Sequence, residues 1–469
     1  MAQDHRVMLI GWDSAPPELV FGRYRDALPT VSRLMGESGW GRLRSTDPPI
    51  TVPAWTSMFS SVNPGGLGFY GFRNLRKGTY DGKWIATAEA IKVDRVWDVA
   101  SRYGKRCCVL GVPQTYPPKP LNGCLVASFL TPSTQSQYTY PPELRDEVAS
   151  VTGGYMLDVE GFRTEDKDQL LSDIYRMTDK HFALARHMLE REDWDLFMYV
   201  EMGPDRLQHG FWKYVDPDHR KYEVGNPYES CLLEYYAHLD AQLGELVDLA
   251  GNDAAIVLMS DHGAKRMEGN FHVNDWLRAE GLLHLKQEPA GVTGISPDLV
   301  DWPRTVAWAW GGYYSRVFMN VKGREPEGCV EAGDYESVRD DLIERFENVV
   351  DDEGRLMETR ALRPEDIYTG PYVKDAPDLL VYFDDLYWRA GQDLGHDTLY
   401  SFDTEIGPDD AVHDYCGVLL FHEPGQTGES RFEEAQAVDV APTVLELLGL
   451  PTPRHMEGTS LLAAGPDRD

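Results

Sequence analysis

The segment Ala254-Ala-Ile-Val-Leu-Met-Ser260-Asp261-His262-Gly263 joins a continuous apolar run to a polar turn that carries a carboxylate and an imidazole. A short apolar run of this kind is typical of a strand that is buried on both faces. Comparable runs occur near residues 6–11, 106–112, 195–201, 377–383 and 416–421. The pattern predicts several core strands, one of which ends immediately before Asp261 and His262.

Helical patterns lie between these runs. Apolar residues spaced as on one face of a helix occur at residues 28–36, 54–61, 94–103, 168–189, 228–250 and 439–448. Strands that alternate with helices indicate a mostly parallel sheet with helices on both faces. The length permits one large domain or two, and we expect a single α/β domain over residues 1–469.

Three segments rich in Pro, Gly and aromatic residues are longer than ordinary connections between strands and helices. They span residues 64–90, 113–161 and 264–370. We predict that they fold as a cap over the strand ends. The polar tail after Leu462 is expected to fray.

Composition limits the partners that the protein can have. With 77 acidic and 45 basic residues the formal net charge is -32, which repels nucleic acid polymers and anionic membranes. Residues 1–12 lack the pattern of a secretory signal, and no apolar stretch reaches about 18 residues, so we expect a cytoplasmic protein without a membrane partner. The six cysteines lack C-x-x-C spacing, which favours reduced, buried thiols. The sequence carries no signal for an oligomeric state.

Several candidate metal ligands lie next to the predicted strands. Asp205 and His209 are four residues apart, so they share one face of a helix and fit either a metal site or an ion pair. Asp13 follows the first apolar run, and His413 precedes the last. Taken singly, an Asp after a strand is more often a turn or helix-cap residue than a ligand, and a lone His is more often a hydrogen-bonded structural residue. Because ligands gather beyond the carboxyl ends of parallel strands, the set together predicts one metal site.

Thr51 is a candidate nucleophile. It stands two residues ahead of Pro53, a residue favoured in the first turn of a helix, so its hydroxyl could lie beside backbone donors for an anion. An ordinary helix cap fits the same pattern. The segment Gly66-Leu-Gly-Phe-Tyr-Gly71 matches G-x-G-x-x-G but follows a helix and precedes polar residues, which disfavours a dinucleotide-binding dehydrogenase.

These segments resemble the alkaline phosphatase superfamily, and most closely its type I phosphodiesterase and nucleotide pyrophosphatase branch. The motifs are Ile10-Gly-Trp-Asp13, Pro49-Ile-Thr-Val-Pro-Ala-Trp-Thr-Ser57, Pro204-Asp-Arg-Leu-Gln-His209, Ser260-Asp-His-Gly263 and Val412-His413. Three further motifs are similar to a predicted phosphohydrolase or phosphomutase subgroup: Asn320-Val-Lys-Gly-Arg-Glu-Pro326, Ala376-Pro-Asp378 and Asp439-Val-Ala-Pro-Thr443. The resemblance implies an alkaline-phosphatase-like fold with a mostly parallel central sheet.

The resemblance also implies a catalytic centre with two divalent ions, Zn²⁺ or Mn²⁺. One ion would be held by Asp13, Thr51, Asp261 and His262, and the other by Asp205, His209 and His413. Thr51 would attack phosphorus to form a phosphothreonine, whose hydrolysis would give net retention at phosphorus. The implied activity is metal-dependent hydrolysis of a phosphodiester or pyrophosphate bond in a small, nucleotide-like phosphate ester.

Other activities remain compatible with the same residues. They are a phosphomonoesterase or phosphomutase, a phosphonate or phosphonate ester hydrolase, and a non-catalytic binding or scaffold protein. A sulfatase is disfavoured because the chain has no C/S-x-P-x-R segment.

The substrate contacts of the family are not all present. Phe72 occupies the offset from Thr51 at which nucleotide pyrophosphatases carry an asparagine, and Leu67 replaces a common histidine. Arg73 and Asn74 are therefore candidates for contacts to the substrate. Cap aromatics, among them Trp310, Tyr313 and Tyr314, are candidates to enclose the substrate, although such residues are more often core. Candidates to hold a second phosphate or carboxylate are Arg206, Lys265 and Arg324, each equally typical of an ion-paired residue.

Overall fold

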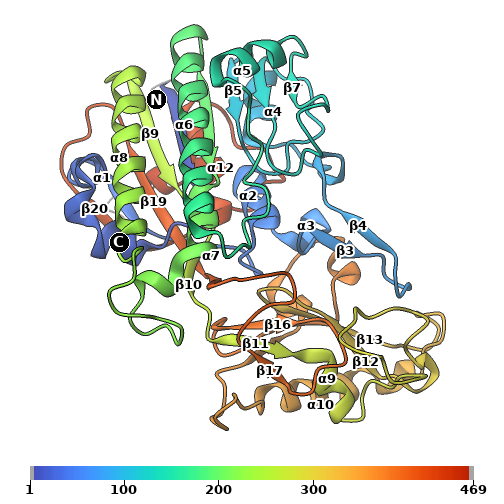
Figure 1. Ribbon diagram of the computed structural model, residues 1–469. Helices are drawn as coiled ribbons and strands as arrows, with labels where there is room; N and C mark the ends of the chain where they lie inside the picture. The colour runs from blue at the N-terminus through green and yellow to red at the C-terminus, as the bar shows by residue number, and fades with distance from the viewer. Residues whose placement is uncertain (1–4, 464–469) are drawn as a thin grey trace.

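A nine-stranded sheet, in the order β20-β2-β19-β9-β1-β8-β5-β6-β7, forms the centre of the larger of two lobes (Figure 1). The computed structural model describes residues 5–463, so residues 464–469 of the predicted tail lie outside the description. The strands are β1 (Arg6–Trp12), β2 (Gly39–Arg44), β5 (Cys107–Leu110), β6 (Gly123–Val126), β7 (Thr139–Tyr140), β8 (Leu196–Glu201), β9 (Ala254–Met259), β19 (Cys416–His422) and β20 (Ser430–Gln436). Strands β1, β5, β6, β8 and β9 run parallel, whereas β19 is antiparallel to both of its neighbours.

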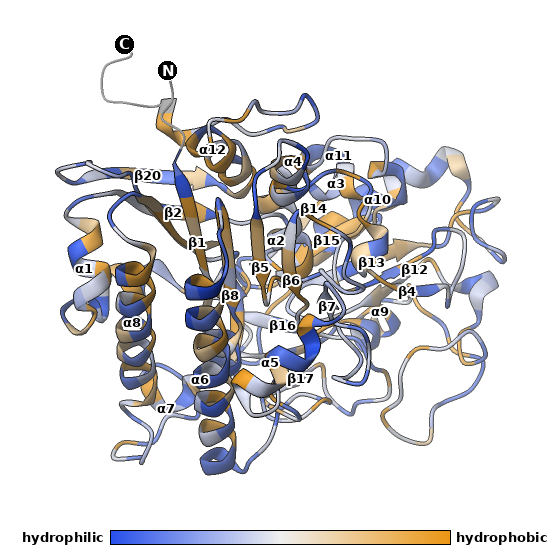
Figure 2. Ribbon diagram, turned by 90° about the horizontal axis from the view of Figure 1, so that it is seen from above, coloured by the Kyte–Doolittle hydropathy of each residue, from blue (hydrophilic) through white to orange (hydrophobic). Residues whose placement is uncertain are grey.

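Helices cover both faces of this sheet, which explains why its central strands are continuously apolar. On one face lie α1 (Pro29–Met35), α6 (Lys167–Arg191), α7 (Gly203–Val215) and α8 (Cys231–Ala250). The other face carries α2 (Thr51–Ser60), α4 (Val96–Arg102) and α12 (Val440–Leu447) (Figure 2). Every residue of β8 and β9 is buried. The mostly parallel α/β sheet predicted from the sequence is therefore confirmed.

The register of the central strands aligns their carboxyl ends. Gly11 of β1 is paired with Val200 of β8 on one side and with Met259 of β9 on the other. The residues that follow these three strands therefore emerge at the same edge of the sheet. Asp13 follows β1 directly, and Asp261 lies two residues beyond the end of β9.

The smaller lobe has its own sheets and its own hydrophobic core (Figure 1). One sheet has the order β16-β11-β17 and the other β12-β13-β15-β14. Their strands are β11 (Gly269–His272), β12 (Ala307–Trp310), β13 (Ser315–Met319), β14 (Arg360–Leu362), β15 (Leu379–Tyr382), β16 (Trp388–Gly391) and β17 (Tyr400–Ser401). Helices α9 (Val273–Ala279), α10 (Tyr335–Glu347) and α11 (Pro364–Ile367) complete this lobe.

Two antiparallel pairs lie outside these sheets. Strands β10 (Gly263–Arg266) and β18 (Ala411–Asp414) pair where the chain leaves and re-enters the larger lobe. The hairpin of β3 (Arg73–Leu75) and β4 (Lys83–Ile85) follows α3 (Pro64–Leu67) and extends toward the smaller lobe (Figure 1). The hairpin contributes partly buried residues, Leu75 and Tyr80, to the core of that lobe.

Two segments lie elsewhere than the sequence pattern indicates. The run at residues 377–383 is a strand, β15, but it belongs to the smaller lobe, because an apolar run does not specify which sheet it joins. Two short parts of residues 113–161, a segment expected over the strand ends, instead extend the central sheet as β6 and β7, and a third part forms α5 (Leu144–Thr152). Prolines and glycines around these short strands hide their periodicity.

No helix within residues 5–463 combines the length and hydrophobicity needed to cross a membrane.

Candidate active site

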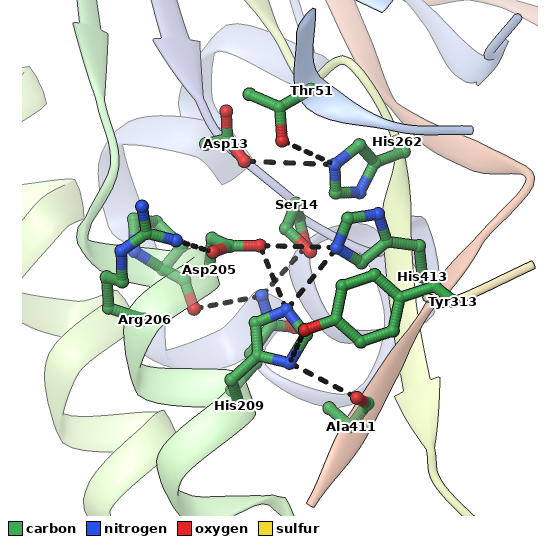
Figure 3. Close-up of polar contacts among 12 residues, drawn as sticks. Asp13, Ser14, Thr51, Asp205, Arg206, His209, His262, Tyr313, Ala411 and His413 are labelled. Atoms are coloured by element: carbon green, nitrogen blue, oxygen red, sulfur yellow. Dashed lines mark hydrogen bonds and ion pairs between the residues drawn. The ribbon is translucent and has the colours of Figure 1, made fainter. Parts of the chain in front are cut away.

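Six of the predicted ligand side chains and the Thr51 hydroxyl gather at the carboxyl edge of the central sheet (Figure 3). Asp205 stands in the first turn of α7, which begins two residues after β8 ends, and His209 lies one turn further along. His413 comes from β18, where it pairs with Ala264 of β10. Residues separated by up to about 400 positions in sequence therefore share one buried site.

The first group of ligands is a triangle around Asp205. Its Oδ1 lies 3.3 Å from Nε2 of His209 and 3.6 Å from Nε2 of His413. The two imidazole nitrogens are 3.3 Å apart. Ligands about 2.0–2.1 Å from a tetrahedral zinc ion are separated by about 3.3 Å, so this triangle has the size of a metal site.

The second group is centred on His262. Its Nε2 lies 3.2 Å from Oδ2 of Asp261, 3.4 Å from Oγ1 of Thr51 and 3.9 Å from Oδ1 of Asp13. His262 also falls within reach of Asp205 and His413, so it lies between the two groups. All of these side chains are buried.

One oxygen of each carboxylate is held by the protein and the other has no partner. Asp13 accepts a hydrogen bond from the Trp55 indole at 2.7 Å through Oδ2, and Asp261 accepts from the Ser14 amide at 3.2 Å through Oδ1. Asp205 is bound by Arg206 through Oδ2. Among the described residues, the remaining oxygens, Oδ1 of Asp13, Oδ1 of Asp205 and Oδ2 of Asp261, are buried without any hydrogen-bond partner. Buried polar atoms normally have a hydrogen-bond partner, so three oxygens without one in the same place indicate a binding site for a cation.

The histidines are oriented by their other ring nitrogens. Nδ1 of His262 donates to the Gly263 carbonyl at 3.0 Å, and Nδ1 of His413 donates to the Pro49 carbonyl at 2.9 Å. Nδ1 of His209 faces Oδ1 of Asp409 at 2.8 Å and the Ala411 carbonyl at 3.1 Å. These bonds fix the tautomer that leaves each Nε2 free, which is the usual arrangement of histidines that bind metal ions.

Burial and crowding shift the pKa values of the carboxylates. Burial raises the pKa of Asp13 well above its ordinary value, and the Asp205 carboxylate adds to the effect. Burial, followed by Asp13, raises the pKa of Asp261 in the same way. Burial alone would also raise the pKa of Asp205, but His209 and Arg206 outweigh it and hold that pKa well below the usual range. A divalent cation between Asp13 and Asp261 would offset their repulsion.

The residues present therefore fit a centre for divalent cations, with oxygen and imidazole ligands and no thiolate.

Cations are expected to stabilise the fold, because they would bind the folded carboxylates and not the unfolded chain. At about one hundred times the Kd, the gain in free energy of unfolding should be about 2.7 kcal/mol per ion. Thermal unfolding of metal-free protein, with and without Zn²⁺ or Mn²⁺, measures it. An unchanged Tm with both ions would contradict a site at these residues.

Thr51 begins α2 without acting as its cap. The capping position is Ile50, and the Thr51 side chain, only 3% exposed, has a single polar contact within the described chain, the one to His262. The ordinary role of a threonine at a helix start is therefore absent. Its hydroxyl instead faces the ligand groups at the positive end of a ten-residue helix.

A cavity of about 510 Å³ opens onto Thr51, Asp205, His209 and His413. Phe72 forms part of its wall and packs edge-on against Phe129, with ring centroids 5.7 Å apart. The wall is completed from the smaller lobe by Trp310, Gly311, Gly312, Tyr313 and Tyr314. This volume lies within the range of small-molecule sites and exceeds the space that a phosphate group alone requires.

The candidate substrate contacts divide into two sets. Arg73 and Arg206 line the cavity, and Arg206 is already bound to Asp205 and to Asp158 at 2.8 Å. Asn74 is buried and does not line this cavity. Its side chain accepts from the Tyr70 amide and donates to the Gly71 carbonyl, so it stabilises the loop that precedes β3.

The structure does not bring the other two candidates into this cavity. Lys265 pairs with Asp414 at 3.1 Å and Asp385 at 3.3 Å. Arg324 pairs with Asp378 at 2.6 Å and Glu325 at 2.8 Å. Both therefore have the ion-paired role that the sequence also allowed.

Sequence reasoning missed Asp409, which orients His209. Burial alone would lower the pKa of His209, but the carboxylates of Asp409 and Asp205 raise it to about 9. An ion at this group must therefore displace a proton below about that pH. The only sequence signal for Asp409 is an acidic pair shortly before His413.

Tyr313 joins the smaller lobe to the ligand groups. Its ring stacks on the imidazoles of His413 and His209, with centroids 4.3 and 4.9 Å apart. Its hydroxyl donates to Oδ2 of Asp409 at 3.0 Å and accepts from Nη2 of Arg163 at 2.6 Å. A residue of the smaller lobe therefore covers ligands that the larger lobe supplies (Figure 3).

Comparison with solved structures defines the class of fold. Murine ectonucleotide pyrophosphatase / phosphodiesterase 5, as an inactive threonine-to-alanine variant in complex with AMP, is 13% identical, with a TM-score of 0.54 over 96% of each chain. The human protein of the same name is also 13% identical, with a TM-score of 0.54 over 97% of each chain. These similarities show that the chain shares the α/β fold of these two solved structures. No curated protein sequence matches the chain.

Residues 7–409 match the family model of type I phosphodiesterase / nucleotide pyrophosphatase. The chain belongs to this family of hydrolases. The matched range contains six of the seven predicted ligands, and His413 lies four residues beyond its end.

Proposed function

We propose that the protein hydrolyses a phosphodiester or pyrophosphate bond of a small, nucleotide-like substrate through a covalent phosphothreonine at Thr51. The observation that carries this proposal is that the Thr51 hydroxyl does not cap α2. It lies 3.4 Å from Nε2 of His262, beside three buried carboxylate oxygens that have no hydrogen-bond partner within the described residues. A helix cap or a structural threonine would need neither feature. The ligand set is equally suited to Zn²⁺ and Mn²⁺.

Each side chain has a definable task in the reaction. The Thr51 oxygen forms a bond to phosphorus as the bond to the first leaving group breaks, and a water then forms a new bond to phosphorus as the Thr51 oxygen leaves. Two such displacements retain the configuration at phosphorus. Cations held by the two ligand groups would lower the pKa of the hydroxyl and stabilise charge on the transferred group. Thr51 is the first residue of α2, so the positive end of this helix lies beside its hydroxyl and favours an anion there.

The cavity favours a diester over a monoester. It extends from Thr51 along apolar walls that include Phe72 and Trp310, which leaves room for a second ester group. A monoester needs no such extension, because three oxygens of its phosphate would contact the ligand groups. The AMP in the murine relative supports a nucleotide-sized substrate for this chain.

Hydrolysis of bis-p-nitrophenyl phosphate should therefore exceed hydrolysis of p-nitrophenyl phosphate. We expect kcat/KM to be at least about tenfold higher for the diester, because its second nitrophenyl group can pack on the apolar wall where the monoester carries only a phosphate oxygen. Release of p-nitrophenolate from both esters, after adding Zn²⁺ or Mn²⁺ to metal-free protein, measures the ratio. Faster turnover of the monoester would instead favour a phosphomonoesterase or phosphomutase on the same centre.

A further inference from the structure

The cationic side chains that line the cavity are of two kinds, those with an ion pair and those without one. Three of its arginines pair with carboxylates: Arg163 with Asp409 at 3.0 Å, Arg206 with Asp158 at 2.8 Å, and Arg389 with Glu405 at 2.9 Å. Arg73, Lys83 and Arg316 also line the cavity, but among residues 5–463 none of them forms an ion pair. Carboxylates neutralise the three paired arginines, whereas no carboxylate within residues 5–463 forms an ion pair with the other three cations.

The three unpaired cations converge from two lobes on one wall. Arg73 and Lys83 lie on the β3–β4 hairpin, where Arg73 is opposite Ile85. Because side chains alternate along a strand, Arg73, Lys83 and Ile85 share one face of the hairpin. Arg316 comes from β13 of the smaller lobe and donates through Nη1 to the Arg73 carbonyl. This cluster is called here the cationic wall.

Trp310 is the common neighbour within the cationic wall. Lys83 Nζ lies 5.0 Å from its ring centroid, and the Arg316 guanidinium carbon lies 5.6 Å from it. Nε of Arg316 is buried and has no hydrogen-bond partner in the described chain. A buried guanidinium donor without a partner is rarer than a solvated surface lysine, so Arg316 distinguishes this wall from an ordinary exposed charge cluster.

The charge of the whole protein strengthens this distinction. The net charge is -32, so acidic residues are abundant. Three of the five arginines that line the cavity form an ion pair with one of them. Three cations left unpaired at one place therefore create a local positive field inside an acidic molecule. Such a field would attract an anion that is small enough to enter the cavity.

We propose that Arg73, Lys83 and Arg316 bind a second anionic group of the substrate, a carboxylate or phosphate separated from the reacting phosphoryl group by a spacer that packs on Trp310. This inference rests on the proposed function, because it assigns the far end of the substrate of that same site. Ile85 and Ile406, 55% and 50% exposed, form an apolar rim of the same cavity beside which the spacer would enter. The substrate class is thus a phosphodiester or pyrophosphate with a further negative charge.

A matched series of substrates tests the cationic wall. The series consists of p-nitrophenyl alkyl phosphodiesters with spacers of three to six carbons that end in methyl, carboxylate, phosphate or trimethylammonium. At the best spacer length, kcat/KM should be about tenfold higher for an anionic end than for methyl, and lower for trimethylammonium, as expected for charge-assisted contacts. This preference should weaken as the salt concentration rises.

Variants distinguish the contribution of the cationic wall to the substrate preference from that of the overall charge of the protein. The triple variant Arg73→Ala, Lys83→Ala, Arg316→Gln should reduce the ratio of anionic to methyl substrate to about 1. Lys83→Glu tests the same point at an exposed position that does not carry the fold, and it should lower the ratio severalfold. The control is Arg431→Ala on β20, which removes another cation that lies over a tryptophan ring, 4.9 Å from the centroid of Trp40 on β2. This variant should keep the full ratio.

The outcomes distinguish this inference from the proposed function. Hydrolysis without any preference for an anionic end, at every spacer length, would overturn the cationic wall alone. A preference that persists in both the triple variant and Lys83→Glu would overturn it as well. If no p-nitrophenolate is released from any member of the series, the proposed phosphodiesterase activity itself fails.

Discussion

Thr51→Ala is expected to abolish phosphodiester hydrolysis while the protein remains folded. The variant removes the only oxygen of α2 that faces His262, at 3.4 Å, so no covalent intermediate can form. Loss of a covalent nucleophile lowers kcat by at least about 10⁴-fold in well-studied hydrolases. Steady-state release of p-nitrophenolate from bis-p-nitrophenyl phosphate measures the effect.

Two variants on the same helix are controls for Thr51→Ala. Thr51→Ser keeps the hydroxyl and should retain measurable turnover. Thr56→Ala removes a second buried threonine hydroxyl of α2, one that bonds the Val52 carbonyl at 2.8 Å and Gln114, away from the ligand groups. It should remain active. Hydrolysis by Thr51→Ala at the rate of the unchanged protein would exclude Thr51 as the nucleophile.

Asp205→Asn is expected to lose one metal ion per chain and nearly all activity. Oδ1 of Asp205 lies 3.3 and 3.6 Å from the two histidine nitrogens of its group, and the amide replaces a charged ligand with a neutral one. We expect the metal content to fall from about two ions to about one, and kcat/KM to fall at least about 10³-fold, because two-metal catalysis needs both positions. Elemental analysis after dialysis measures the stoichiometry.

The two ligand groups should respond independently to substitution. Asp261→Asn should remove the ion of the other group, and the double variant should bind none. Asp240→Asn is the matched control, since Asp240 is also fully buried but accepts from the amides of Thr30 and Val31 at 2.8 Å, at the contact between α8 and α1. It should keep both ions although it weakens the fold. Two ions retained by Asp205→Asn would contradict its role as a ligand.

The strands and the places of the candidate ligands at their ends were predictable from sequence because both depend on local pattern. A buried parallel strand such as β9 has a continuous apolar run, and its end fixes where Asp261 must lie. The edge strand β20 was not predicted, because most of its residues are exposed and polar, as suits an edge that must not pair further. β15 was predicted as a strand but not as part of the smaller lobe.

Contacts between distant residues were beyond the reach of local pattern. Asp409 is one of many acidic residues until its position beside His209 is known. Lys265, Arg324 and Arg316 all carry a positive charge, yet carboxylates neutralise the first two and leave the third without an ion pair. Which cations are available to a substrate is decided by tertiary pairing, not by sequence composition.

Tyr313 gives the centre a consequence for motion between the lobes. Its ring covers His209 and His413, while its hydroxyl bonds Asp409, so the smaller lobe cannot move away without uncovering ligands of the larger one. If ions bind more tightly when Tyr313 covers these histidines, ion binding and lobe closure favour each other by the same free energy. In that case ions would also stabilise the arrangement of the two lobes that forms the cavity, in addition to their role in the reaction.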